Sequence, residues 1–99
     1  MATFSQAREL AEAWVRISSN GSARLVREAT RAKPYAWVFF YQSSNGSAPL
    51  AGNAPILIDR VNLEIRVFGT AQSIDVYLEA YERTIAGARL LQKPEEPLW

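Results

Sequence analysis

Trp37-Val-Phe-Phe-Tyr41 is the strongest predicted β-strand in this 99-residue sequence. All five side chains are aromatic or β-branched, and such side chains suit a pleated, half-buried surface. Alternation along a strand places Trp37, Phe39 and Tyr41 on one face. Val38 and Phe40 then lie on the other face, so both faces are apolar. We therefore expect a sheet whose second face leaves aromatic side chains exposed to water or to a partner.

Three further strands are expected around this one. Residues 23–33 lead into Lys33-Pro34, a pair that favours extended backbone before a turn. Residues 54–60 are rich in β-branched and leucine side chains and form the third strand. Residues 64–68 form the fourth strand, which pairs with the third through a short turn.

A helix is expected at each end of the strands. Thr3 and Gln6 have the spacing of a capping box, and apolar side chains follow at helical intervals as far as Ile17. Asn20-Gly21 then predicts the end of this helix. Near the other end of the chain, Ser73 is the expected N-cap of a second helix, whose apolar stripe continues to about residue 88.

The predicted order is therefore αββββα, which is typical of an α+β fold. We expect one four-stranded antiparallel sheet with the N- and C-terminal helices packed on the same face. Residues 1–92 are predicted to form a single domain, because 99 residues supply one modest hydrophobic core. Residues 93–99 contain two prolines and two glutamates, and we expect a loosely ordered tail there.

The composition argues against catalysis. The sequence has no histidine and no cysteine, which removes the usual general base, the thiolate nucleophile and the common zinc ligands. Asp59 and Glu64 flank a hairpin turn and are the best candidates for a catalytic carboxylate pair. Salt bridges to the neighbouring Arg60 and Arg66 are the simpler explanation for both carboxylates. We expect no enzyme, no cofactor and no metal ion.

Charge and hydropathy leave a cytoplasmic protein as the expectation. Eleven basic and ten acidic side chains give a net charge of +1, which predicts little attraction to nucleic acid or to a membrane. The first residues lack the basic and apolar regions of a signal peptide. No apolar stretch approaches the roughly 20 residues of a membrane span.

Two other functions fit parts of the pattern. Residues 33–40 match an RNA-recognition signature at six of eight positions, with proline in place of its glycine. Single-stranded nucleic acid would then stack on the sheet-face aromatic side chains. A chaperone-like or ligand-binding module would use the same aromatic face. Nucleic acid is the less favoured partner, because the net charge is close to zero.

Four stretches together resemble the immunity protein 35 family, also called YrhB-like. They occur in the family's order and cover the chain as far as about residue 85: Tyr35-Ala-Trp-Val-Phe-Phe-Tyr-Gln-Ser43, Leu50-Ala-Gly-Asn-Ala-Pro-Ile-Leu-Ile-Asp-Arg60, Phe68-Gly-Thr-Ala71 and Tyr77-Leu-Glu-Ala-Tyr81. The resemblance implies a small bacterial immunity protein that binds a cognate polymorphic toxin and neutralises it.

Such a protein needs exposed anchors and complementary charge rather than reactive groups. The expected partner-binding residues are two sheet aromatics, two loop asparagines and a basic row that would suit an acidic toxin surface: Trp37, Tyr41, Asn45, Asn53, Arg27, Arg31 and Lys33. The basic row lies on one face if its strand is regular. An uncovered aromatic face would also allow a homodimer.

Overall fold

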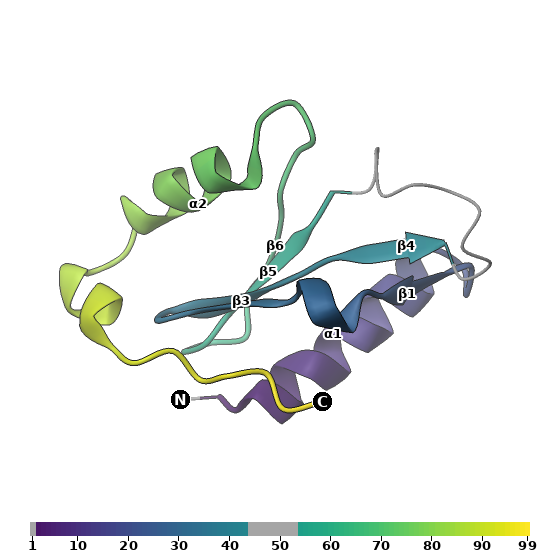
Figure 1. The fold of residues 1–99 in the computed structure, drawn as a ribbon, viewed down its shortest axis with the longest axis horizontal. Helices are drawn as coiled ribbons and strands as arrows, with labels where there is room; N and C mark the ends of the chain where they lie inside the picture. The colour runs from purple at the N-terminus through teal and green to yellow at the C-terminus, as the bar shows by residue number, and fades with distance from the viewer. Residues whose placement is uncertain (1, 44–53) are drawn as a thin grey trace.

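The structure is a computed structural model that describes residues 2–43 and 54–99. These residues form an α+β fold with two antiparallel sheets (Figure 1). In chain order the elements are α1 (Phe4–Ser18), β1 (Ala23–Leu25), the 3₁₀ turn η1 (Arg27–Ala29), β2 (Arg31–Lys33), β3 (Ala36–Phe39), β4 (Tyr41–Ser43), β5 (Ile56–Asp59), β6 (Ile65–Val67), α2 (Ile74–Glu82) and the 3₁₀ turn η2 (Gly87–Leu91).

The four-stranded sheet has the order β2-β3-β5-β6, and β1 pairs with β4 in a second, two-stranded sheet. Residues 23–33 and 36–43 still run antiparallel to each other, because the Val26 N–H donates to the Phe40 carbonyl at 2.8 Å between the two ladders. The turn η1 interrupts the first of these stretches. The expected antiparallel pairing is therefore confirmed, whereas the expected single sheet is wrong, since η1 divides the long hairpin.

The predicted capping box starts α1. The Thr3 side chain accepts a hydrogen bond from the Gln6 N–H at 3.3 Å, and the Gln6 side chain accepts one from the Thr3 N–H at 2.9 Å. After Ser18 the chain reverses through Asn20 and Gly21, whose φ angles are 55° and 80°. Glycine and asparagine tolerate this left-handed region best, so the turn occurs where the sequence predicted it.

The two helices cover opposite faces of the four-stranded sheet (Figure 1). On one face, Trp37 and Phe39 of β3 pack in a cluster that includes Phe4 of α1. On the other face, Val38 of β3 packs in a cluster that includes Leu78 of α2. The expectation that both helices share one face is wrong, because a central strand with two apolar faces is stable only when both faces are covered.

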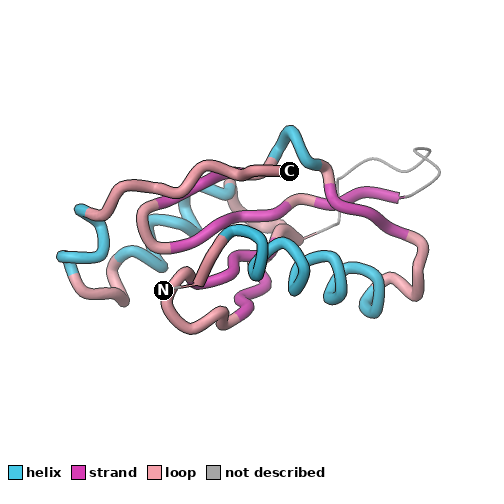
Figure 2. The backbone as a smooth tube through the Cα atoms, turned by 90° about the horizontal axis from the view of Figure 1, so that it is seen from below, coloured by secondary structure: helices cyan, strands magenta, loops and turns pink. Residues whose placement is uncertain are grey.

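The C-terminal segment, expected to be loosely ordered, packs against the α1 face and runs beside the strands (Figure 2). The Trp37 indole N–H donates to the Glu95 carbonyl at 2.8 Å, and the Phe4 N–H donates to the Glu95 carboxylate at 3.0 Å. Trp99 meets the Phe4 ring edge-on, with 5.3 Å between centroids. A buried indole N–H needs a partner, and this segment supplies it.

The helix α2 ends at Glu82, earlier than the apolar stripe predicted. The Thr84 hydroxyl donates to the Tyr81 carbonyl at 2.7 Å, which satisfies a carbonyl of the last turn without further helix. Residues 87–91 then form the 3₁₀ turn η2. This shorter helix brings Arg89 back toward the sheet, where it contacts Asp59.

Candidate functional site

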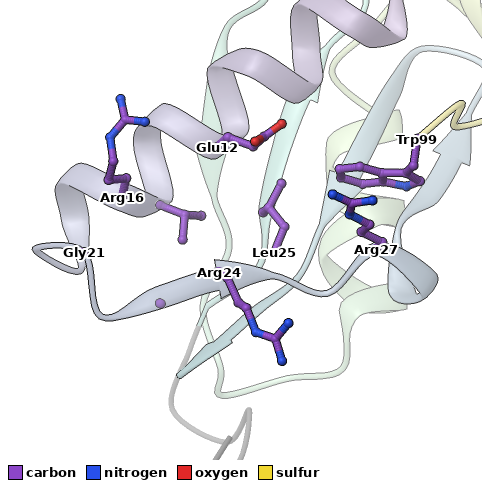
Figure 3. A pocket seen from close by; sticks show the side chains of 9 residues that line it. Glu12, Arg16, Gly21, Arg24, Leu25, Arg27 and Trp99 are labelled. Carbon is purple, nitrogen blue, oxygen red and sulfur yellow. The ribbon is translucent and has the colours of Figure 1, made fainter. Parts of the chain in front are cut away.

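A cleft of about 430 Å³ lies between the C-terminal half of α1, strand β1 and the C-terminal segment (Figure 3). Nine residues line it: Glu12, Val15, Arg16, Gly21, Ala23, Arg24, Leu25, Arg27 and Trp99. Three of the nine are arginines and one is a glutamate. The cleft therefore combines an excess of positive charge with an aromatic wall.

Local sequence explains how the cleft forms. The Gly21 N–H donates to the Arg16 carbonyl at 2.8 Å, which closes the end of α1 and turns the chain back beside it. In the returning strand, Leu25 packs against the same core cluster as α1, and it points toward α1 in Figure 3. Val15 is buried beneath the cleft. Val15 and Leu25 therefore form an apolar floor, and the arginine side chains line the rim of the cleft.

Trp99 joins the core to the cleft. Its ring meets Phe39 edge-on, with 6.3 Å between centroids. The Arg27 guanidinium lies 5.4 Å from the centroid of the Trp99 ring. Figure 3 shows the two side chains stacked. A guanidinium over an indole ring gains electrostatic energy while it keeps its hydrogen-bond donors. Arg27 is thus held in place at the edge of the cleft with its donors available.

The arginines of the cleft differ from most other cations of the chain in having no acidic partner. In the part of the chain that the structure describes, Arg16, Arg24 and Arg27 form no ion pair, whereas six other basic side chains do: Arg8, Arg31, Lys33, Arg66, Arg83 and Arg89. Residues 44–53 contain no acidic side chain in the sequence. Arg60 and Lys93 also lack an ion pair among the described residues, and Arg60 donates instead to the carbonyls of Pro34 and Lys93. Three of the five cations without an acidic partner in this described part of the chain therefore line this cleft.

The three arginines project in different directions. In Figure 3, Arg16 lies at the outer end of α1 and Arg24 points away from the helix, whereas Arg27 stacks on Trp99. Glu12 does not neutralise them, because its carboxylate pairs with Arg8 at 3.2 Å. Of the three guanidinium groups, only that of Arg27 lies against another residue of the cleft, the Trp99 ring.

A smaller cleft of about 270 Å³ adjoins the first, since both are lined by Val15 and Ala23. Its other lining residues carry hydroxyl groups: Ser18, Ser19, Ser22, Tyr41 and Ser43. The Ser19 hydroxyl donates to the Val15 carbonyl at 2.6 Å, so part of this polar lining serves the end of α1. The two clefts extend the candidate surface along α1 and β1.

Trp37 is fully buried, so the prediction that it is an exposed anchor is wrong. Phe39 is buried as well, and no aromatic sheet face remains open on β3. An exposed aromatic face was the basis for three predictions: a chaperone-like module, stacking of nucleic acid and a homodimer. Because that face is buried, it supports none of them. The physical reason is the cover on both faces of the sheet, by α1 with the C-terminal segment on one side and by α2 on the other.

Tyr41 keeps a place on the candidate surface. Its ring is half-buried, meets Trp14 edge-on at 5.9 Å between centroids, and lines the smaller cleft. Burial raises the pKa of the Tyr41 hydroxyl above its ordinary value, so this hydroxyl is protonated near neutral pH. Its role in partner binding stays a prediction.

The basic row does not share one face. Arg27 lies in η1 at the cleft, whereas Arg31 pairs with Asp75 at 3.2 Å and Lys33 with Glu82 at 4.0 Å, both on the α2 side. The expectation of a single row is wrong because η1 breaks the regular alternation of the strand. The two predicted loop residues, Asn45 and Asn53, lie outside the described residues.

Of the nine residues that line the cleft, only Arg27 was predicted to bind the partner; Arg16, Arg24 and Trp99 are among those that were not. Trp99 could have been predicted to pack against the fold, because so large an apolar side chain is rarely left fully exposed, even in a polar, proline-containing segment. Nothing in the sequence indicated that Arg16 and Arg24 lack acidic partners. That property depends on side chains from distant parts of the chain.

The carboxylates that were considered for catalysis are structural. Glu64 pairs with Arg66 at 3.3 Å, whereas Asp59 is buried and pairs with Arg89 at 2.8 Å. The Tyr81 hydroxyl also donates to Asp59 at 2.5 Å. Burial opposes ionisation of Asp59, but the hydrogen bonds from Tyr81 and Arg89 outweigh it and hold the pKa of Asp59 below its ordinary value.

The two tyrosines of this network are held neutral. Burial, with a hydrogen bond to Glu82, raises the pKa of Tyr35 far above its ordinary value. Burial, with the hydrogen bond to Asp59, does the same for the pKa of Tyr81. Neither hydroxyl is prepared to act as a base. The network therefore links β5 to the C-terminal third of the chain.

Two absences concern the described residues, 2–43 and 54–99. They contain no group of three or more acidic side chains placed to hold a metal ion. Neither of their helices combines the length and the hydrophobicity that crossing a membrane requires.

Comparison with known proteins finds a partial relative. The chain is 44% identical over 43 residues to "Uncharacterized protein YrhB" of Escherichia coli (strain K12). The matched stretch covers 43% of this chain and 46% of that relative. No family model matches the chain, and no solved structure matches it. The similarity supports a YrhB-like relationship, and assignment to the immunity protein 35 family goes beyond it.

Proposed function

We propose that this chain is a non-catalytic protein-binding domain that binds an acidic surface of its partner at the cleft between α1, β1 and Trp99. One observation carries the proposal: of the five cations without an acidic partner in the described residues, three line this cleft, namely Arg16, Arg24 and Arg27. Arginine and tryptophan are enriched at the centres of protein interfaces, where they combine contact area with directed hydrogen bonds.

We further propose that the partner is a toxin of a polymorphic toxin system, which the chain neutralises by binding. The four family-like stretches motivate this proposal, and the partial similarity supports a YrhB-like relationship. A sequence without histidine or cysteine suits an inhibitor that blocks by occupation of a surface. Complementary charge would also speed the encounter with the toxin.

The test uses the toxin domain encoded directly upstream of the gene. Calorimetric titration of that domain with the full chain measures affinity, and the toxin's own activity assay measures neutralisation. Arg27→Glu should weaken binding about tenfold or more, because it reverses a charge at the proposed interface and removes the stack on Trp99. Arg16→Glu should weaken it less, since Arg16 lies at the outer end of the cleft.

The matched control is Arg83→Glu. Arg83 is an exposed arginine at the C-cap of α2, where it pairs with Glu79 at 2.8 Å, so its reversal changes the net charge by the same amount at a residue that does not line the cleft. Toxin binding should survive this change. Equal losses for Arg27→Glu and Arg83→Glu would show that only net charge matters and would reject the cleft. Unchanged binding by Arg27→Glu would reject it as well.

Single-stranded nucleic acid is the second candidate ligand, favoured by the Arg27 guanidinium over the Trp99 ring. Fluorescence anisotropy with a labelled oligonucleotide at about 0.15 M salt separates the two. Micromolar binding that is lost in both Arg27→Glu and Trp99→Ala would favour nucleic acid. Toxin binding without oligonucleotide binding would favour the protein partner.

A further inference from the structure

Strand β6 forms one edge of the four-stranded sheet, and its outward backbone groups are unpaired among the described residues. The Asp59 N–H donates to the Glu64 carbonyl at 2.9 Å, and the Phe68 N–H donates to the Pro55 carbonyl at 2.9 Å. Backbone groups alternate in direction along an antiparallel strand. Since Glu64 and Phe68 face β5, Ile65 and Val67 direct their N–H and carbonyl groups to the free edge.

The side chains of this edge are accessible. Val67 is 54% exposed, and the side chains of Glu64 and Arg66 are 53% and 52% exposed. An open edge with unpaired N–H and carbonyl groups is a template for another strand. The remaining question is which strand fits the charges that this edge presents.

We propose that β6 pairs antiparallel with β6 of a second copy of this chain, which joins two four-stranded sheets edge to edge. In the register centred on Ile65, each Ile65 lies opposite its equivalent and exchanges both backbone hydrogen bonds with it. Each Glu64 then lies opposite Arg66 of the other copy. Each copy forms this ion pair within its own strand, at 3.3 Å, so two internal pairs are exchanged for two pairs across the interface.

The other symmetric registers fit less well. In the register centred on Ile65, Val67 lies opposite Leu63, whose N–H already donates to the Asp59 carbonyl. A register centred on Arg66 would pair the outward groups of both Ile65 and Val67, but it places two arginines opposite each other. A register centred on Val67 sets Arg66 opposite Phe68 and leaves the charge without a partner. Like charges directly opposite are unfavourable, so the charges select the register centred on Ile65.

The opposite edge of the sheet, β2, does not offer the same fit. Its two charged side chains, Arg31 and Lys33, are both basic and already pair with carboxylates of α2. Two β2 strands side by side would place basic side chains opposite each other. The self-complementary sequence of β6 is therefore what makes a second copy the fitting occupant of that edge.

Sedimentation equilibrium of the full chain, over a wide range of concentration, tests this directly. The average mass should rise from 11.1 kDa toward twice that value as concentration increases. Arg66→Glu should weaken self-association about tenfold or more, because carboxylates then face carboxylates at both symmetric positions. Glu64→Arg should do the same with arginines. Pairing through β6 does not depend on toxin binding, so either proposal can be rejected without the other.

Mixing gives the decisive measurement. Glu64→Arg and Arg66→Glu weaken their own dimers but complement each other, so an equimolar mixture should associate. The double variant Glu64→Arg/Arg66→Glu should also recover the dimer, because the exchange preserves opposite charges in this register. Arg83→Glu, which breaks an exposed pair on α2, should dimerise as the unmodified chain does. Circular dichroism establishes that each variant folds.

Three results would overturn the proposal. One is a monomer of unmodified chain at every concentration. Another is undiminished self-association by folded Arg66→Glu, which would move the contact elsewhere. The third is a mixture of the two single variants that stays monomeric, which would reject the register. Recovery in both the mixture and the double variant supports pairing through β6.

Discussion

The two faces of the four-stranded sheet are closed by different chemistry. On the α1 face, aromatic side chains contact one another: Phe4, Trp37, Phe39 and Trp99. The Trp37 indole N–H donates its hydrogen bond to a backbone carbonyl. On the α2 face, the buried Asp59 carboxylate binds a guanidinium and a tyrosine hydroxyl. The first face gains stability from apolar burial, whereas part of the stability of the second depends on ionisation.

The largest effect is expected from the centre of the α1 face. Trp37→Ala should lower the free energy of unfolding by about 3–5 kcal/mol, because it leaves a large cavity and frees the C-terminal segment. Urea unfolding near neutral pH measures the loss. Ile17→Ala, at a side chain that is 75% exposed, should change stability by less than about 0.5 kcal/mol. Similar values for the two variants would contradict the packing of this face.

The next largest effect belongs to the α2 face and depends on pH. Asp59→Asn should cost about 2–3 kcal/mol near neutral pH, because it removes charge-assisted hydrogen bonds from Arg89 and Tyr81. The pKa of Asp59 is lowered on folding, so its contribution is complete above the unfolded pKa of about 3.9 and is lost as pH falls through the folded pKa.

Unfolding measured at several acidic pH values should therefore bring the unmodified chain and Asp59→Asn closer together. Trp37→Ala should keep its deficit relative to the unmodified chain over the same range, because the charged group over that ring, the Arg60 guanidinium, stays protonated at acidic pH. A constant difference between the unmodified chain and Asp59→Asn would contradict the role of ionised Asp59.

A smaller effect is expected at the edge of the α1 face. Trp99→Ala should cost about 1–2 kcal/mol, because it removes edge-on contacts with Phe4 and Phe39. Leu98→Ala is the matched control, since Leu98 is next to Trp99 in the chain and its side chain is 75% exposed. Thermal unfolding of both variants compares them. Equal stability would mean that the C-terminal segment adds nothing to this face.

The smallest effect is expected at the rim of the α2 face. Arg31→Ala removes an exposed ion pair with Asp75 and should cost at most about 0.5 kcal/mol. Because Arg31 lies away from the cleft, this variant should bind the proposed toxin partner as the unmodified chain does. If Arg31→Ala weakened binding as much as Arg27→Glu, Arg31 would belong to the binding surface with Arg27, as the sequence predicted.

Local chemistry made much of the fold predictable. The capping box at Thr3, the turn at Asn20-Gly21 and the central strand follow from interactions between near neighbours. The interruption at Arg27–Ala29 contains neither glycine nor proline, so nothing marked it. The opposite placement of the helices was implicit in the two apolar faces of β3, although a single covered face was predicted.

The candidate site was less predictable because it depends on distant residues. Arg27 was predicted, but its stacking on Trp99 joins positions 72 residues apart. Asp59 was recognised as chemically interesting, yet its partner Arg89 lies 30 residues further along the chain. Which cations remain unpaired is a property of the folded surface, and no local pattern encodes it.

The hydrogen bond between Phe4 and Glu95 has a kinetic consequence. It spans 91 residues, so the entropy cost of closing this loop is high and we expect the contact to form late in folding. A contact made that late contributes little to the folding transition state, and its loss accelerates unfolding while folding proceeds at nearly the same rate. We therefore expect variants that lose this contact to unfold faster while they fold at nearly the same rate.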